Sequence, residues 1–155
     1  MLDSKAELFA VFAEVDGYER PLILTGLTFG RLIDEVILPN EEDKPFFVDG
    51  ALVDKKKIRR LKILRQKEAF QTAFFDLHHG MRRKDEKIQK LYGEQYHVRL
   101  EAALREGCED VTSQVIKAYA VKVKPNIKKY LPNRSEIIEG AWTFFMEALK
   151  KLGGL

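Results

Sequence analysis

The chain has 155 residues, of which 45% are hydrophobic and 33% charged, and its net charge is +3. A chain of this size forms one domain or two small units that share a core, and its apolar runs are too short for a transmembrane helix. The first residues lack the basic segment of a signal peptide, and the single cysteine, Cys108, excludes a disulfide framework within the chain, so we expect a cytoplasmic protein.

Two Asp-Gly pairs organise the first third of the chain. Apolar residues alternate over 9–15 before the pair at 16–17, and Asp-Gly favours the left-handed conformations of a tight hairpin turn. A second pair at 49–50 separates PFFV from ALVD and predicts a second hairpin. Because Pro21 has no N–H, the strand that returns from the first turn should be an edge strand or begin after it.

Helical spacing of apolar residues predicts one helix between the hairpins, from Phe29 to Ile37. We expect Thr28 to cap its start and Pro39 to stop it. The stretch KKKIRRLKILRQ then fits two structures. As a strand with a bulge near Arg59 it turns Leu61 and Ile63 inward and Arg60, Lys62 and Leu64 outward. As a helix it has only a thin apolar stripe, so we favour the strand.

Hairpin, helix, hairpin and strand follow one another over residues 7–65, and this order resembles the ubiquitin-like β-grasp. FFVDGALVD is similar to the turn of that family, and LKIL is similar to its final strand. The chain lacks the long loop that ubiquitin places between these two elements. The resemblance implies a small β-grasp-like sheet with one helix at the N-terminus, in residues 1–66, and it covers none of the rest of the chain.

After Gln66 the pattern is helical. Residues 69–77 share an apolar face that Gly80 should end, and the polar segment 81–95 fits a surface helix or a connection. An apolar stripe from Tyr96 to Val123 predicts the longest helix. A terminal helix should begin with a cap at Asn133 or, alternatively, at Ser135. The fold class is therefore α+β, with a helical unit of three or four helices in residues 67–155.

Charge is divided unevenly along the chain. Residues 1–54 carry 4 Lys and Arg against 12 Asp and Glu, and residues 55–155 carry 23 against 12. The two parts could neutralise each other, stack with further copies, or bind an acidic partner. Three interpretations of the basic residues remain open: a solvated strand face, a nucleic-acid surface, or a surface for an acidic protein. These residues are Lys55, Lys56, Lys57, Arg59, Arg60, Lys62, Arg65, Lys67, Arg82, Arg83 and Lys84.

The terminal helix has large apolar residues on nearly all sides. A helix on a small bundle buries one stripe, so a second apolar face would meet either the chain's own core or another chain. Aromatic residues and methionine are enriched in interface cores. We therefore predict a protein interface at Trp142, Phe144, Phe145 and Met146.

Chemical motifs are weak throughout the chain. The adjacent histidines His78 and His79 diverge on a helix and lack metal-ligand spacing, and Cys108 has no local signature of a nucleophile. No phosphate-binding glycine motif is present. We expect no catalytic residue, cofactor, metal or small-molecule substrate.

These patterns favour a non-enzymatic protein-interaction or assembly module, an adaptor or small subunit that self-associates. The alternative is a nucleic-acid-binding protein that uses segment 55–67 together with 82–84. An enzyme of unknown type is the third hypothesis.

Overall fold

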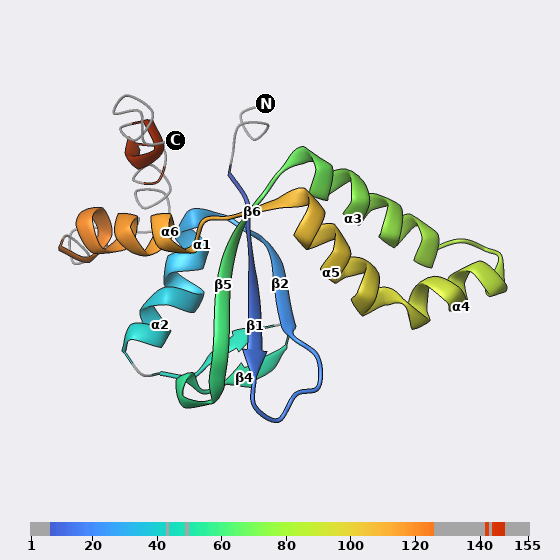
Figure 1. The fold of residues 1–155 in the computed structure, drawn as a ribbon, viewed down its shortest axis with the longest axis horizontal. Coiled ribbons are helices and arrows are strands. Elements are labelled where there is room, and N and C mark those ends of the chain that lie inside the picture. The colour runs from blue at the N-terminus through green and yellow to red at the C-terminus, as the bar shows by residue number, and fades with distance from the viewer. Residues whose placement is uncertain (1–6, 43, 49, 126–141, 143, 148–155) are drawn as a thin grey trace.

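A computed structural model describes residues 7–42, 44–48, 50–125, 142 and 144–147 (Figure 1). The protein is α+β, with a four-stranded antiparallel sheet in the order β2-β1-β5-β6 and a separate two-stranded ribbon, β3-β4. None of the helices described is both long enough and apolar enough to cross a membrane. The predicted start of the terminal helix at Asn133 or Ser135 lies outside the described residues.

The sheet comes first along the chain, and its first two strands form the predicted hairpin. Strand β2 begins directly after Pro21 and lies at one edge of the sheet, as expected. The connection spans six residues, 16–21, so the prediction of a two-residue turn was wrong, although Gly17 has a positive φ of 95°. The strands of the sheet are β1 (Phe9–Val15), β2 (Leu22–Leu27), β5 (Ile58–Gln66) and β6 (Cys108–Asp110).

The basic stretch is a strand, and it contains the predicted bulge. Glu14 of β1 pairs with Arg60 and the next residue, Val15, pairs with Ile58, so Arg59 is the extra residue of β5. Beyond this bulge Ile63 is buried against one face of the sheet and Leu61 packs beside it. The inward positions of β5 were therefore predicted correctly, but Leu64, expected on an outward face, is buried in the core on the opposite side of the sheet.

The helix after the first hairpin is longer than predicted. It runs through α1 (Phe29–Leu32), the π-helix η2 (Ile33–Ile37) and α2 (Leu38–Glu41), and the Thr28 hydroxyl caps it by accepting the Arg31 N–H at 3.3 Å. Pro39 does not stop it. A proline ring clashes with the carbonyl four residues earlier in an α-helix. Here that carbonyl belongs to Glu35, which lies in the wider π-helix η2.

The second hairpin is the ribbon of β3 (Phe46–Val48) and β4 (Ala51–Val53). Gly50 supplies the positive φ of its turn, 78°, and Asp49 lies outside the described residues. After β4, Asp54 caps the short helix η3 (Lys55–Lys57), since its carboxylate accepts the Lys56 N–H at 3.0 Å. The ribbon therefore leads into the most basic turn of the chain.

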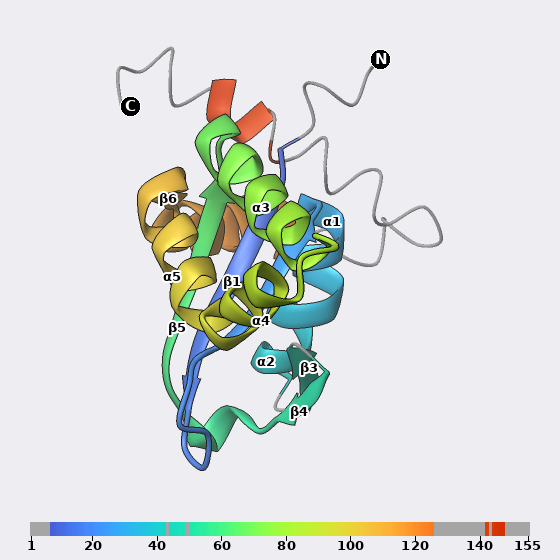
Figure 2. The same cartoon turned by 90° about the vertical axis from the view of Figure 1, so that its right-hand side faces the viewer.

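Residues 67–107 form a helical arm that is inserted between β5 and β6. Figure 1 shows the arm extending away from the sheet, and Figure 2 shows it in front of one sheet face. The Lys67 N–H donates to the Gly107 carbonyl at 3.1 Å and closes the base of the arm. Its helices are α3 (Glu68–Met81), α4 (Glu86–Glu94) and α5 (Tyr96–Gly107).

The single helix predicted from Tyr96 to Val123 was wrong. Its stripe is interrupted by β6, which pairs with the end of β5, and the chain then continues as α6 (Thr112–Ala118) and the π-helix η4 (Tyr119–Val123). The pairing supplies backbone hydrogen bonds that an edge of β5 would otherwise lack. The second half of the chain therefore contributes a strand to the sheet.

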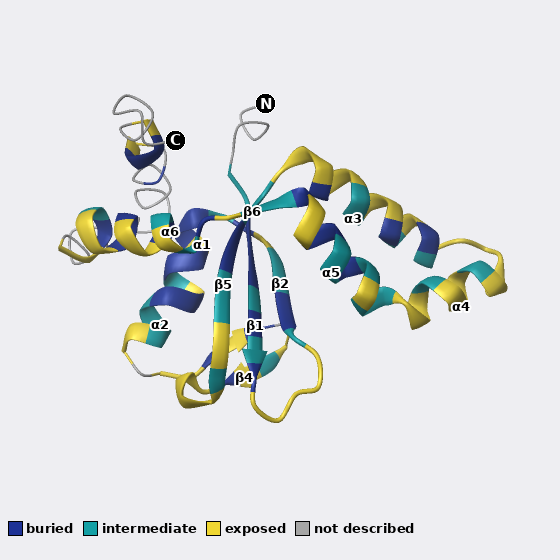
Figure 3. Ribbon diagram, in the orientation of Figure 1, coloured by how far each residue is buried: buried dark blue, intermediate teal, exposed yellow. Residues whose placement is uncertain are grey.

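Two hydrophobic cores cover the two faces of the sheet. One face, which includes Phe9 and Ile63, packs against α1, η2, α6, η4 and Trp142. The opposite face, which includes Ala10 and Leu64, packs against the inner sides of α3 and α5. Figure 3 shows buried residues along the strands and on these inner helix sides, whereas exposed residues follow α4 and the turn before it.

Thr112, which follows β6, is hydrogen-bonded to strand β5 of the sheet. Its hydroxyl accepts the Ile63 N–H at 2.8 Å and donates to Asp110 Oδ1 at 2.7 Å, and the Val111 N–H donates to the Ile63 carbonyl at 3.0 Å. Partial burial would raise the pKa of Asp110, but hydrogen bonds from Thr112 and the charge of Lys62 together lower it. Asp110 is therefore an ionised acceptor that orients the Thr112 hydroxyl.

Replacing Thr112 by Val should lower the free energy of unfolding by about 1–2 kcal/mol, because the Ile63 N–H loses its acceptor in a half-buried position. Thr112→Ser keeps the hydroxyl and should cost clearly less. Urea unfolding followed by circular dichroism measures both variants. Equal losses for Val and Ser would show that the hydroxyl contributes nothing.

Candidate interaction surfaces

The interior of the arm is an aromatic stack. Phe74 lies 5.3 Å from Phe70 and 4.2 Å from His78 between ring centroids, and His78 lies 6.1 Å from Tyr96. His78 is thus part of the packing between α3 and α5, while His79 stacks on Phe75 on the exposed side. No group of three metal-binding side chains occurs in the part of the chain that the structure describes.

The end of the arm is held by a close approach at Gly80. This residue does not end α3 as predicted; it is buried within it, and a Cβ there would lie 2.5 Å from the Tyr92 ring of α4. Arg99 covers the same ring at 4.3 Å from its centroid. Asp85 caps α4 by accepting the Lys87 N–H at 2.9 Å. These contacts fix α4 against the rest of the arm.

The outer side of the arm is apolar and basic. Phe75 is 69% exposed, and Leu91 and Val98 are also exposed. The turn between α3 and α4 contains Arg82, Arg83 and Lys84, which are exposed and form no ion pair within the described residues. Helix α4 has no fully buried side chain. A stretch that contributes so little to the core is available to meet another molecule.

The basic segment of β5 is divided among several environments. Arg59 pairs with Asp16 at 3.0 Å, and Arg65 pairs with Glu109 at 2.5 Å. The Lys62 ammonium lies 5.9 Å from the centroid of the Phe12 ring. Arg60 is exposed, Lys67 stands at the base of the arm, and Lys55–Lys57 lie at the other end of β5.

The structure does not bring this segment together with the arm cations. The turn 82–84 lies at the outer end of the arm, and residues 55–57 lie at the far end of the sheet (Figure 1). Among the described residues, the lysines at 55–57 and the cations at 82–84 therefore do not share one surface.

The uneven charge of the chain is partly neutralised by its own folding. Lys124 in the second half pairs with Glu41 at 2.9 Å, and Arg65 lies 3.8 Å from Glu7. Hydrogen bonds from Lys124 and then Tyr119 lower the pKa of Glu41. Together with the Arg59–Asp16 pair, these contacts join the basic second part to the acidic first part.

The terminal aromatic residues are mostly buried within the chain. Trp142 is 1% exposed, and Phe145 and Met146 are also buried. The rings of Phe9 and Phe29 lie 5.1 and 5.2 Å from that of Trp142. Three of the four predicted interface residues therefore belong to the core.

Phe144 is the exception among these four residues. It is 57% exposed, and the Lys122 ammonium lies 4.5 Å from the centroid of its ring. The terminal helix thus offers a single aromatic side chain to a partner within the described residues.

Cys108 lines a shallow hollow of about 290 Å³ between the arm and the sheet, together with Phe12, Lys62 and Leu104. Burial raises the pKa of its thiol to about 11, although a backbone hydrogen bond and the charge of Lys67 act in the opposite direction. A thiol with this pKa is protonated at neutral pH and is a poor nucleophile.

Sequence reasoning missed an apolar pair on the ribbon. Phe47 and Leu52 are direct cross-strand partners and are 64% and 56% exposed, while Phe46 and Val53 on the other side are buried. The signal was available, because successive side chains of a strand point to opposite faces. Of the two adjacent phenylalanines, one had to face away from the core.

Comparison with protein-family models finds no match, and comparisons with curated proteins and with solved structures find none either.

Proposed function

We propose that the protein is a non-enzymatic interaction module, an adaptor or small subunit of a larger cytoplasmic complex, and that the helical arm meets its protein partner. This proposal rests on the structure of the outer end of the arm. There α4 and the turn before it add no buried side chain to either core, yet capping and the Gly80 contact hold them in one shape. A protruding element that touches the core only through the half-buried Tyr92 suits recognition.

The composition of the arm favours a protein over nucleic acid. Residues 67–107 carry eight Lys and Arg against seven Asp and Glu, so the arm as a whole is nearly neutral. A phosphate-tracking surface needs a clear excess of cations. Phe75, Leu91, Arg82 and Arg83 are all exposed on the arm, and they match the aromatic, apolar and arginine content of protein interfaces.

The test is recovery of the native complex with the full chain as bait, with and without nuclease. Arg82→Glu combined with Phe75→Ser should abolish recovery of the partner, because charge and apolar contact are removed from the same side of α3. Ile116→Ser combined with Lys117→Glu is the matched control, since these exposed residues lie on α6. The control should leave recovery unchanged.

Two results would contradict the proposal. The first is equal recovery of the partner protein by both double variants. The second is loss of the partner protein from the wild-type bait after nuclease treatment. Sedimentation equilibrium of the purified chain, wild type and arm variant, tests in addition whether the arm mediates self-association.

A further inference from the structure

The outer face of the ribbon displays an aromatic ring on a firm support. Phe47 points away from the core beside Leu52, and the residues flanking it on β3, Phe46 and Val48, are buried. A ring that is exposed on a strand fixed in this way is not free to fold back into the core. It offers one flat apolar face to solvent.

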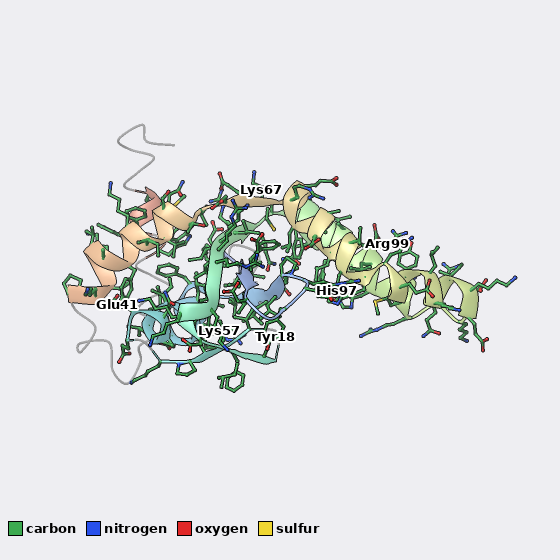
Figure 4. All side chains as sticks on the ribbon, turned by 60° about the horizontal axis from the view of Figure 1, so that its bottom comes forward. Tyr18, Glu41, Lys57, Lys67, His97 and Arg99 are labelled. Carbon is green, nitrogen blue, oxygen red and sulfur yellow. The ribbon has the colours of Figure 1, made fainter. Side chains whose placement is uncertain are left out.

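A second exposed ring lies at the same end of the sheet. Tyr18 stands in the loop between β1 and β2 and is 42% exposed. The loop is tied to the basic turn because the Asp16 N–H donates to the Lys57 carbonyl at 2.8 Å. Figure 4 shows Tyr18 and Lys57 together at this end. The basic run Lys55–Lys57 thus has an aromatic neighbour that is distant in sequence.

Three acidic side chains of the described residues near this turn are engaged. Asp16 pairs with Arg59 and Glu41 with Lys124, and the Asp54 carboxylate caps η3. Lys56 and Lys57 are exposed and form no ion pair with any described residue. Residues 54–60 carry five Lys and Arg against one Asp, so the turn has an excess of positive charge.

We propose that the ribbon residues Phe47 and Leu52, the following Lys56 and Lys57, and Tyr18 of the neighbouring loop bind single-stranded nucleic acid. Exposed aromatic rings beside a cationic track are the arrangement that stacks unpaired bases and follows the phosphate backbone. The lysines supply the complementary charge, and Phe47 and Tyr18 supply the stacking faces. This site is separate from the arm and goes beyond the proposed protein interaction.

Fluorescence anisotropy with fluorescein-labelled dT12 and rU12 at about 50 mM salt tests the proposal with the full chain. Wild-type protein should bind at least one of them saturably. Phe47→Ala should weaken binding about tenfold, through loss of one stacked base. Lys56→Gln with Lys57→Gln should reduce the slope of log K against log salt by about 1.4, which is about 0.7 for each phosphate contact on a single strand.

Matched controls lie on the arm. Phe75→Ala removes an equally exposed phenylalanine, and Lys84→Gln with Lys87→Gln removes two exposed lysines; none of these changes should alter binding. Absence of binding to both single strands would overturn the proposal. So would equal affinity for a duplex of the same length or for a labelled oligoglutamate peptide, because either result would mean attraction by charge without stacking.

The two proposals fail independently. Arm variants that lose the protein partner but bind dT12 normally support the separation of the surfaces. Ribbon variants that bind dT12 as wild type does would sink this inference and leave the arm proposal standing.

Discussion

Replacing Trp142 by Ala should lower the free energy of unfolding by about 3–5 kcal/mol, the usual cost of removing a large buried aromatic side chain. The ring is 1% exposed and contacts Phe9 of β1 edge-on, with ring centroids 5.1 Å apart. It also lies 5.2 Å from Phe29 of α1 and 6.3 Å from Phe145. Truncation therefore opens a cavity where the terminal helix, the sheet and α1 meet.

Phe144→Ala is the matched control for this prediction. Phe144 belongs to the same segment and is 57% exposed, so its truncation should change stability by less than about 0.5 kcal/mol. Urea unfolding should be followed by circular dichroism, because Trp142 is the only tryptophan. If Trp142→Ala were no more destabilising than Phe144→Ala and instead abolished self-association, the terminal helix would be an interface and not a core element.

The parts of the fold that the sequence predicts are those with a local cause. The two hairpins, the inward positions of β5 and its bulge at Arg59 are all visible over a few residues, because a strand repeats every two residues. The Thr28 cap is local in the same way. These signals do not depend on which distant segment lies alongside.

The elements that were mispredicted depend on distant contacts. Cys108, Val111 and Val115 fall at helical spacing, so the sequence between Tyr96 and Val123 fits one helix. Pairing of Cys108–Asp110 with the end of β5 overrides that pattern. Nothing near Thr112 in the sequence reveals that its hydroxyl accepts an N–H from a strand 49 residues earlier.

In the candidate surfaces, too, the residue types could be predicted from the sequence, but their distant contacts could not. The cations of β5 are plain in the sequence, but their partners are not: Arg59 is neutralised by Asp16 and Arg65 by Glu109. The terminal aromatics were assigned to an interface on the assumption of a small helical bundle. A sheet face that accepts Trp142 provides burial that this assumption left out.

Replacing Gly107 by Ala should lower the free energy of unfolding by about 3 kcal/mol, toward the upper end of the cost of overpacking. A Cβ at Gly107 would collide with the backbone N and Cα of Phe70. That backbone cannot move away easily, because Phe70 is fully buried and its N–H donates to the Lys67 carbonyl at 3.0 Å. The added methyl group would force apart the two ends of the arm where they join the sheet.

Gly93→Ala is the control, and it should raise the free energy of unfolding. A Cβ at Gly93 meets no atom within 4 Å, and Gly93 lies inside α4, where alanine stabilises a helix by about 0.5–1 kcal/mol relative to glycine. Urea unfolding of the two Gly→Ala variants measures the difference, and hydrogen exchange locates it. Faster exchange across α3 and α5 in Gly107→Ala, with β1 protected as in wild type, would mean that the arm loosens as a unit. A neutral Gly107→Ala would mean that the arm is not clamped at its base, and the rigidity on which its proposed role in recognition depends would be lost.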